Sequence, residues 1–256
     1  MCIRDRCQDV QFFCVEFLLD ILFNSDNIFK KIHCFNKTMS QSGNKFIKSM
    51  SLINLLPQKI QEELSSKSLL KVISGLSNFE TQSVKKISEA ASIGGADLID
   101  IACKPELVES AIEISSLPIC VSSVDPKLFI NSVKAGASLI EIGNYDTFYD
   151  KGITFSEEKI LNLTKETKDF LPNIPLSVTV PHNLPIDKQV DLAIKLVFEG
   201  ADIIQTEGGK NANPYSSGIQ GLLEKSVPTL AATYAIFNEF EKQSINIPIM
   251  SASGLS

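Results

Sequence analysis

Short apolar runs of strand length alternate with amphipathic segments along most of the chain. In residues 187–199, apolar side chains recur at i, i+3, i+4 and i+7, and residues 157–171 have the same period, so both segments predict helices. Strand alternating with helix seven times over predicts a parallel sheet. Residues 52–66, before the first run, predict a short leading helix that could plug one end of the sheet. The predicted strands cover residues 70–76, 97–103, 118–123, 138–144, 175–180, 202–207 and 247–253.

Two phrases repeat in strict alternation within this pattern. One places a glycine at a helix end, then a short turn and a buried strand. The other places a proline directly before a strand. Such alternation is typical of a (β/α)8 TIM barrel, and a doubly wound Rossmann-type sheet is the alternative, although no GxGxxG follows the first strand. The first phrase is GGADLIDIA (94–102), AGASLIEIG (135–143) and EGADIIQTEG (199–208), and the second is LPICVSS (117–123), IPLSVTV (174–180) and IPIMSAS (247–253).

Residues 1–50 do not fit the pattern. They hold seven of the 15 phenylalanines, and their apolar run of 14 residues, 10–23, is too short for a membrane span and contains Glu16 and Asp20. The same acids argue against a signal peptide. The opening MCIRDR resembles translated sequencing adapter. We therefore interpret residues 1–50 as a non-native or disordered extension, with translation starting at Met39 or Met50.

Residues 51–256 are the predicted barrel domain, and they account for seven of its eight units. The sequence therefore predicts a TIM barrel truncated after strand 7, with the eighth unit missing. Such a chain would expose apolar strand edges, so we expect it to fold poorly.

Composition and charge narrow the classes of partner. The chain is 44% apolar and 21% charged, as in globular proteins, and carries a net charge of −6. An acidic chain lacks the basic surface that nucleic acid or acidic lipid requires, so neither is an expected partner. Two histidines cannot form a His-rich metal site. Four of the six cysteines lie in the first 34 residues and no CxxC occurs, which favours a reducing compartment and no structural metal.

The aligned repeats predict which strand side chains point into the barrel. Side chains alternate between the two faces of a strand, and the β-branched set, such as Ile99 and Ile101, should face the helices. The opposite set then lines an unusually polar interior. It comprises Asp100, Glu141, Gln205 and Glu207 on one type of strand, Cys120, Ser122, Ser177 and Thr179 on the other, and Ser74 on the first strand.

Polar residues at the carboxyl ends of the strands are candidates for chemistry, because active sites of TIM barrels lie there. The catalytic candidates are Glu207, Asp100, Glu141 and His182. A structural hydrogen-bonded network is the alternative for Asp100 and Glu141, and a surface position is the alternative for His182. A small-residue phrase, SASGLS (251–256), could bring backbone N–H groups to a phosphate. The ligand-binding candidates are Ser74, Lys104, Ser122, Asn144, Thr179, Gln205, Gly208, Gly209, Ser253 and Gly254.

Several phrases in residues 51–256 are distinctive of one family. KVISGL (71–76), EIGNYDTFY (141–149), LSVTVPH (176–182) and PTLAATYAI (228–236) closely resemble the hypothetical chloroplast reading frame twenty-three family of algal plastids and cyanobacteria. The resemblance implies an aldolase-type TIM barrel in the plastid stroma or in the cytoplasm of a cyanobacterium-like cell. It implies no known activity.

Three functions remain open. GADIIQT resembles the strand of deoxyribose-phosphate-type class I aldolases, which read GADFIKT, but Gln205 stands where they have the Schiff-base lysine, which disfavours that chemistry. The leading hypothesis is a lyase-like or isomerase-like enzyme that binds a small phosphorylated or carboxylated metabolite. The alternatives are an FMN-dependent oxidoreductase, from a weaker resemblance to nitronate-oxidising barrels, and a non-catalytic metabolite-binding or regulatory barrel. The oligomeric state does not follow from the sequence.

Overall fold

The computed structural model describes residues 52–149, 151–208 and 216–252. The chain divides into two units, Met1–Lys48 and Ser49–Ser256, and every described residue belongs to the second. The predicted extension 1–50 and three predicted ligand residues, Gly209, Ser253 and Gly254, lie outside the described residues.

Seven parallel strands form one sheet in the order of the sequence, which confirms the predicted parallel sheet. Each strand pairs with the strand that follows it, as successive βα units of a TIM barrel do. Within the described ranges, β1 and β7 pair on one side only. The strands are β1 (Lys71–Gly75), β2 (Leu98–Ala102), β3 (Ile119–Ser123), β4 (Leu139–Ile142), β5 (Leu176–Val180), β6 (Ile203–Thr206) and β7 (Ile249–Ser251).

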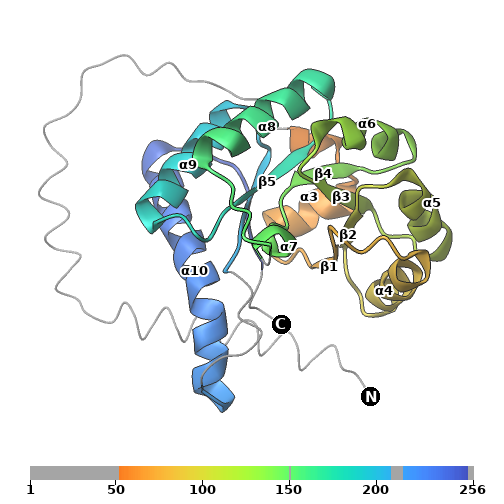
Figure 1. Ribbon diagram of the computed structural model, residues 1–256, viewed down its shortest axis with the longest axis horizontal. Helices are drawn as coiled ribbons and strands as arrows, with labels where there is room; N and C mark the ends of the chain where they lie inside the picture. Colours follow the sequence, from red (N-terminus) through yellow and green to blue (C-terminus); the bar gives the residue numbers. More distant parts are fainter. Residues whose placement is uncertain (1–51, 150, 209–215, 253–256) are drawn as a thin grey trace, which may run out of the picture. The chain divides into compact units, whose positions relative to one another are not determined.

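Helices connect the strands and cover the outer face of the curved sheet (Figure 1). Pro57 divides the predicted leading helix into a 3-10 turn and a helix, because proline fits only the start of a helix. The bounds are η1 (Leu52–Leu55), α3 (Gln58–Ser65), α4 (Thr81–Ile93), α5 (Pro105–Ile114), α6 (Pro126–Lys134), α7 (Asp146–Tyr149), α8 (Glu157–Phe170), α9 (Ile186–Phe198) and α10 (Gly218–Gln243).

Two apolar cores lie on opposite faces of the sheet. The larger core contains the β-branched strand residues, such as Ile99 and Val121, together with the inner faces of the helices. The smaller core lies inside the curve of the sheet, where Leu56 and Ile60 pack against Leu98 and neighbouring strand residues. The alternation read from the repeats is therefore confirmed, and the leading helix closes the amino-terminal end of the interior.

The repeated glycine ends a helix in all three copies. Gly95, Gly136 and Gly200 have φ values of +80°, +116° and +103°, a backbone region that other residues rarely adopt. In each copy the strand begins three residues later. The predicted turn is therefore present at every repeat.

Two aspartates of the repeat tie strands together at the amino-terminal end of the sheet. Asp97 accepts the N–H of Leu70, 3.0 Å away, at the start of β1. Asp202 accepts the N–H of Leu176 at 3.0 Å, and the Lys168 ammonium lies 3.0 Å from the same oxygen. Two of the three copies of the repeat thus supply a carboxylate acceptor for a backbone donor, and the third copy has Ser138 at this position.

We expect Asp202→Ala to lower the free energy of unfolding by about 2–3 kcal/mol, because two backbone donors and the Lys168 ammonium lose a buried charged acceptor. The second backbone donor is Leu52 N–H, 2.6 Å from Asp202 Oδ1. Urea-induced unfolding followed by circular dichroism measures the difference. Asp169→Ala, the same change at an exposed position of α8, is the control. Equal stability of the two variants would contradict the assignment.

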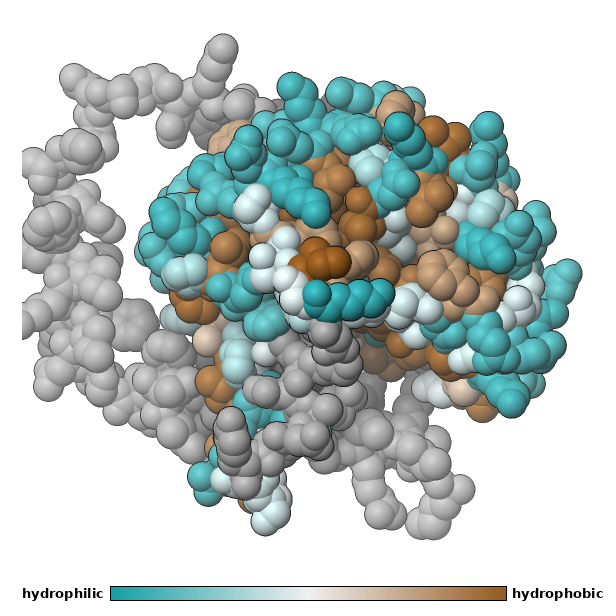
Figure 2. Space-filling model, viewed as in Figure 1, coloured by the Kyte–Doolittle hydropathy of each residue, from teal (hydrophilic) through white to brown (hydrophobic). Residues whose placement is uncertain are grey.

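The visible surface carries both polar and apolar residues. Figure 2 shows polar residues around the rim of the visible face and apolar residues gathered toward its middle, near α7. None of the helices in the described ranges is both long enough and apolar enough to cross a bilayer.

Candidate functional site

Three side chains meet at the carboxyl ends of β4, β5 and β6. Glu207 directly follows β6, His182 follows β5 by two residues, and Tyr149 ends the short helix α7 after β4. Glu207 is only 5% exposed, whereas 30% of the His182 side chain is exposed. We call these three residues the mouth cluster.

One oxygen of Glu207, Oε1, is contacted by three polar groups of the mouth cluster. The Tyr149 hydroxyl donates to Glu207 Oε1 over 2.6 Å. The backbone N–H of His182 donates to the same atom over 3.0 Å, and His182 Nδ1 also lies 3.0 Å away. The backbone N–H can only donate, and the Tyr149 hydroxyl donates to the same atom, so Oε1 acts as an acceptor. An acceptor at Oε1 assigns the proton of a neutral ring to His182 Nδ1. His182 Nε2 then holds the lone pair of the neutral ring.

A second polar cluster lies deeper inside the sheet and is centred on Lys71. The Lys71 ammonium lies 2.5 Å from Glu141 Oε2 and 3.5 Å from Asp100 Oδ2. The three side chains are 5%, 0% and 1% exposed, so this ion network is almost completely removed from water. We call Lys71, Asp100 and Glu141 the interior cluster.

Neutral side chains complete the hydrogen bonds of both buried carboxylates. Asp100 accepts from Ser122 Oγ over 2.6 Å and from Asn144 Nδ2 over 3.0 Å. Glu141 Oε1 accepts from Gln205 Nε2 over 2.7 Å and from the Thr179 hydroxyl over 3.4 Å. Six predicted site residues thus belong to one network with Lys71: Asp100, Ser122, Glu141, Asn144, Thr179 and Gln205. These contacts are of the kind that the structural alternative for Asp100 and Glu141 describes.

In the interior cluster, burial and the neighbouring charges shift the pKa values in opposite directions. Burial alone would lower the pKa of Lys71, but the carboxylates of Glu141 and Asp100 outweigh it, so the pKa of Lys71 is raised and its ammonium stays charged. Burial raises the pKa of Glu141, and the Lys71 charge opposes that effect. Two carboxylates with one lysine leave the cluster with one surplus negative charge whenever both are ionised.

The same position has the donors of a metal site. One ligand atom each from Asp100, Cys120 and Glu141 lies within 4.8 Å of the other two. The Lys71 ammonium already supplies a cation to both carboxylates, and burial holds the pKa of the Cys120 thiol well above its ordinary value. A cysteine binds a metal ion as the thiolate, whereas Cys120 is held as the thiol. This donor set therefore does not fit a metal while Lys71 is present.

Two predicted ligand residues lie apart from both clusters. Ser74 occupies a β-bulge in β1, and its Oγ accepts from Asn78 Nδ2 over 2.9 Å, so Lys71 and not Ser74 is the polar residue of β1 that reaches the interior. Lys104 precedes α5 with 48% of its side chain exposed, and it pairs at 3.9 Å with Glu106. The geometry gives neither residue a contact with the mouth cluster.

Gly208, the residue after Glu207, allows α10 to approach the mouth. A Cβ on this glycine would lie 2.2 Å from Thr229 Oγ1 and 3.1 Å from the Thr229 backbone nitrogen. Thr229 also donates to the Ala252 carbonyl over 3.1 Å, so α10 contacts the chain that follows both β6 and β7.

We expect Gly208→Ala to lower the free energy of unfolding by about 1–3 kcal/mol, because the added methyl group overlaps the Thr229 side chain. Adding Thr229→Ala removes the nearest atom and should recover part of the loss. Thermal unfolding of the two single variants and the double variant measures this. Additive losses in the double variant would show that the two side chains do not compete for the same space.

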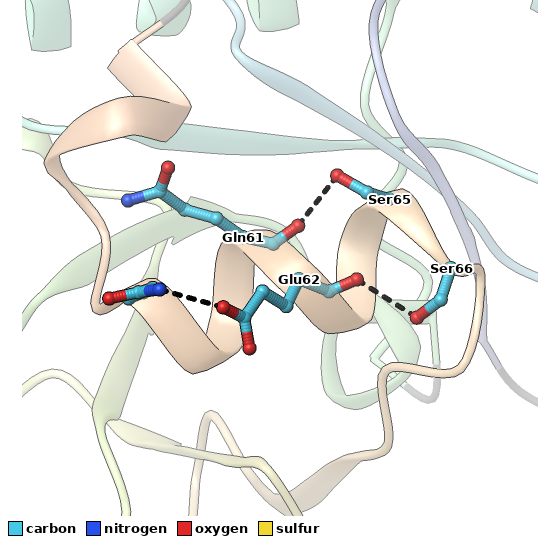
Figure 3. A pocket seen from close by; sticks show the side chains of 5 residues that line it. Gln61, Glu62, Ser65 and Ser66 are labelled. Atoms are coloured by element: carbon cyan, nitrogen blue, oxygen red, sulfur yellow. Dashed lines mark hydrogen bonds between the residues drawn. The ribbon is translucent and has the colours of Figure 1, made fainter.

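A shallow hollow on α3 is not related to either cluster (Figure 3). Gln58, Gln61, Glu62, Ser65 and Ser66 line it. They bond mainly within their own helix, as Ser65 Oγ does to the Gln61 carbonyl over 2.8 Å.

Sequence reasoning missed Lys71 and Tyr149. Lysine usually lies at the surface, and β1 lies outside the repeats from which the interior positions were read. The only feature of the sequence that could have indicated an interior lysine is the position of Lys71 as the first residue of an apolar strand. Tyr149 lies in a four-residue helix that has no measurable periodicity.

Comparison with known proteins identifies the family. The model of a family described as "Protein of unknown function (DUF561)" matches residues 55–256. An "Uncharacterized protein ycf23" from Cyanophora paradoxa is 47% identical over 200 residues, covering 77% of this chain and 79% of its own. The protein of the same name from Pyropia yezoensis is 38% identical over 201 residues, covering 78% and 72%.

A solved structure supports the fold. The apo-form of a Toxoplasma gondii ME49 protein named as a "putative deoxyribose-phosphate aldolase" matches with a TM-score of 0.50 and 19% identity, over 74% of this chain and 78% of its own. This likeness confirms the aldolase-type TIM-barrel fold and carries no activity with it. The family model and the relatives agree, so the chain belongs to the family described as DUF561, and it is similar to proteins named ycf23, the reading-frame family that its sequence motifs resemble.

Proposed function

We propose that this protein is an enzyme that moves a proton on a small phosphorylated or carboxylated metabolite at the mouth of the barrel. The observation that carries the proposal is the contact of 3.0 Å between His182 Nδ1 and Glu207 Oε1. A carboxylate that holds Nδ1–H leaves the other ring nitrogen as the base, which is the arrangement general acid–base catalysis needs near neutral pH.

The roles follow from the surroundings of each group. His182 takes and returns the proton, because it is the more exposed member of the pair. Glu207 orients the ring and stabilises the imidazolium that forms when His182 gains a proton. Asp100 and Glu141 are too deeply buried to touch a substrate at the mouth. They act by holding Asn144, which follows β4, and Thr179 on β5.

Schiff-base chemistry has no support from the described lysines of the interior. A Schiff base forms from a neutral amine, whereas the carboxylates of Glu141 and Asp100 raise the pKa of Lys71 and keep its amine protonated. The proposed reaction is therefore an isomerisation or a lyase step that begins with proton removal next to a carbonyl group.

The anionic group of the substrate would be held by backbone N–H groups of the small-residue segments after β6 and β7, where Gly209, Ser253 and Gly254 occur. These residues lie outside the described ranges, so this part of the proposal rests on sequence alone. We also propose that the protein works in the plastid stroma, or in the cytoplasm of a cyanobacterium-like cell, since its relatives are ycf23 proteins.

Exchange of substrate protons with heavy water tests the proposal without requiring the complete reaction. The protein is incubated in D2O with single members of a panel of small phosphorylated or carboxylated carbonyl compounds. We expect deuterium to enter the carbon next to the carbonyl of at least one compound, detected by proton NMR, with much slower exchange in a Glu207→Gln sample. Exchange that persists unchanged in Glu207→Gln would overturn the assignment.

A further inference from the structure

The mouth cluster contains a third polar group that the proposed chemistry does not yet use. The Tyr149 hydroxyl makes the shortest of the contacts to Glu207 Oε1, at 2.6 Å. The Tyr149 ring also meets the His182 ring edge to face, with centroids 4.9 Å apart. Tyr149 therefore touches both members of the acid–base pair.

An aromatic cluster holds the chain on either side of α7 in place. Tyr145 stacks on Phe155 with centroids 4.6 Å apart, and Phe148 meets Phe155 edge to face at 5.2 Å. The buried Tyr145 hydroxyl donates to the Thr179 carbonyl over 3.1 Å, which ties this segment to β5. The position of Tyr149 is thus set by packing that is independent of its own hydroxyl.

We propose that Tyr149 is a positioning residue that limits how strongly Glu207 binds His182. This inference rests on the proposed function. A carboxylate oxygen offers about two lone pairs, so three donors to Glu207 Oε1 compete, and each added donor weakens the hydrogen bonds that the others make. Without the Tyr149 hydroxyl, Glu207 would accept the Nδ1–H bond more strongly and stabilise the imidazolium more. His182 Nε2 would then be a stronger base and would return the proton to the substrate more slowly.

The hydrogen bond at His182 Nδ1 can be measured without any substrate. The chain has only two histidines, and the His182→Asn spectrum identifies the signals of His182. Long-range proton–nitrogen NMR reports the shift of Nδ1 through the non-exchanging carbon-bound protons of the ring. We expect Tyr149→Phe to move the Nδ1 signal downfield, because Nδ1–H then donates to a carboxylate with one donor fewer.

Tyr145→Phe is the matched control, since it removes a hydroxyl from the same segment without a hydrogen bond to Glu207. A downfield shift in Tyr149→Phe with no shift in Tyr145→Phe supports the proposal. An unchanged Nδ1 signal in Tyr149→Phe overturns it, and so does an equal movement in both variants, which would indicate a general rearrangement.

A second substitution keeps the test decisive if Tyr149→Phe does not fold. Replacing Tyr149 with 3-fluorotyrosine retains the ring and makes its hydroxyl a stronger donor, so the Nδ1 signal should move upfield; a downfield shift would contradict the proposal. In a Glu207→Ala background, which has no side-chain acceptor at this position, adding Tyr149→Phe should not move the Nδ1 signal further. These shifts do not depend on turnover, so they can succeed even if no compound in the exchange panel reacts.

Discussion

Replacing Lys71 with methionine should lower the free energy of unfolding by about 3–5 kcal/mol at pH 8. The change removes the positive charge between two carboxylates that are 0% and 1% exposed. Breaking a buried ion pair from one side costs this much because the remaining charge has neither a partner nor water. Urea-induced unfolding at several pH values gives the measurement.

The loss should be smaller at pH 5 than at pH 8. Burial raises the pKa of Glu141 above its ordinary value, so the folded protein binds this proton more tightly than the unfolded chain does. Stability that comes from the protonated carboxyl is fully present below the ordinary pKa and is lost as pH rises through the folded pKa. Without Lys71 nothing opposes the effect of burial, so the dependence on pH becomes steeper.

Two variants serve as references for Lys71→Met. Lys85→Met removes a lysine from a partly exposed pair with Glu113, 3.2 Å apart, and should change stability by less than about 1 kcal/mol. Adding Glu141→Gln to Lys71→Met removes one of the stranded charges and should restore part of the loss. If Lys71→Met is as stable as the original protein at pH 8, the ion network contributes nothing.

Replacing His182 with asparagine should reduce proton exchange on a reactive compound by about 10²- to 10⁴-fold, the usual contribution of a general acid–base group. Asparagine keeps the backbone N–H that donates to Glu207 but has no titrating nitrogen. Glu207→Gln should also be strongly impaired, since it weakens the orientation of the ring. Initial rates of deuterium incorporation measured by proton NMR provide the comparison.

Glu113→Gln is the matched control for Glu207→Gln, because it makes the same change in a side chain that is 70% exposed. Its exchange rate should equal that of the original protein. Circular dichroism must show that His182→Asn remains folded. A folded His182→Asn protein that retains full exchange would assign the proton transfer to another group.

The repeats predicted most of the fold because they report packing directly. In each copy a glycine ends the helix and an alternating strand follows, so the inward positions of Asp100, Glu141 and Gln205 could be read without any structure. β1 lies outside the repeats and carries a β-bulge between Ile73 and Gly75, so no aligned copy indicated its inward positions and Lys71 was missed. Periodicity is informative only where the strand is regular.

Two of the three residues of the mouth cluster, Glu207 and His182, were predicted from the sequence. Glu207 and His182 follow strands whose ends were already predicted, so their shared location followed from the fold class. The hydrogen bond between the two residues could not be predicted from the fold class, because it depends on the path of the chain after β5. Tyr149 depends on the aromatic packing of residues 145–155, which no local pattern encodes.

The aspartate ties of the repeat and the mouth cluster lie at opposite ends of the same strands. Asp202 precedes β6 and Glu207 follows it, so four strand residues separate a group that secures the sheet from a group proposed to perform chemistry. Substitutions at the two ends should therefore be selectable independently. A variant library could be screened for thermal stability at the end that carries Asp97 and Asp202, while the opposite end is varied for new substrates. This separation makes the sheet a practical scaffold for directed evolution.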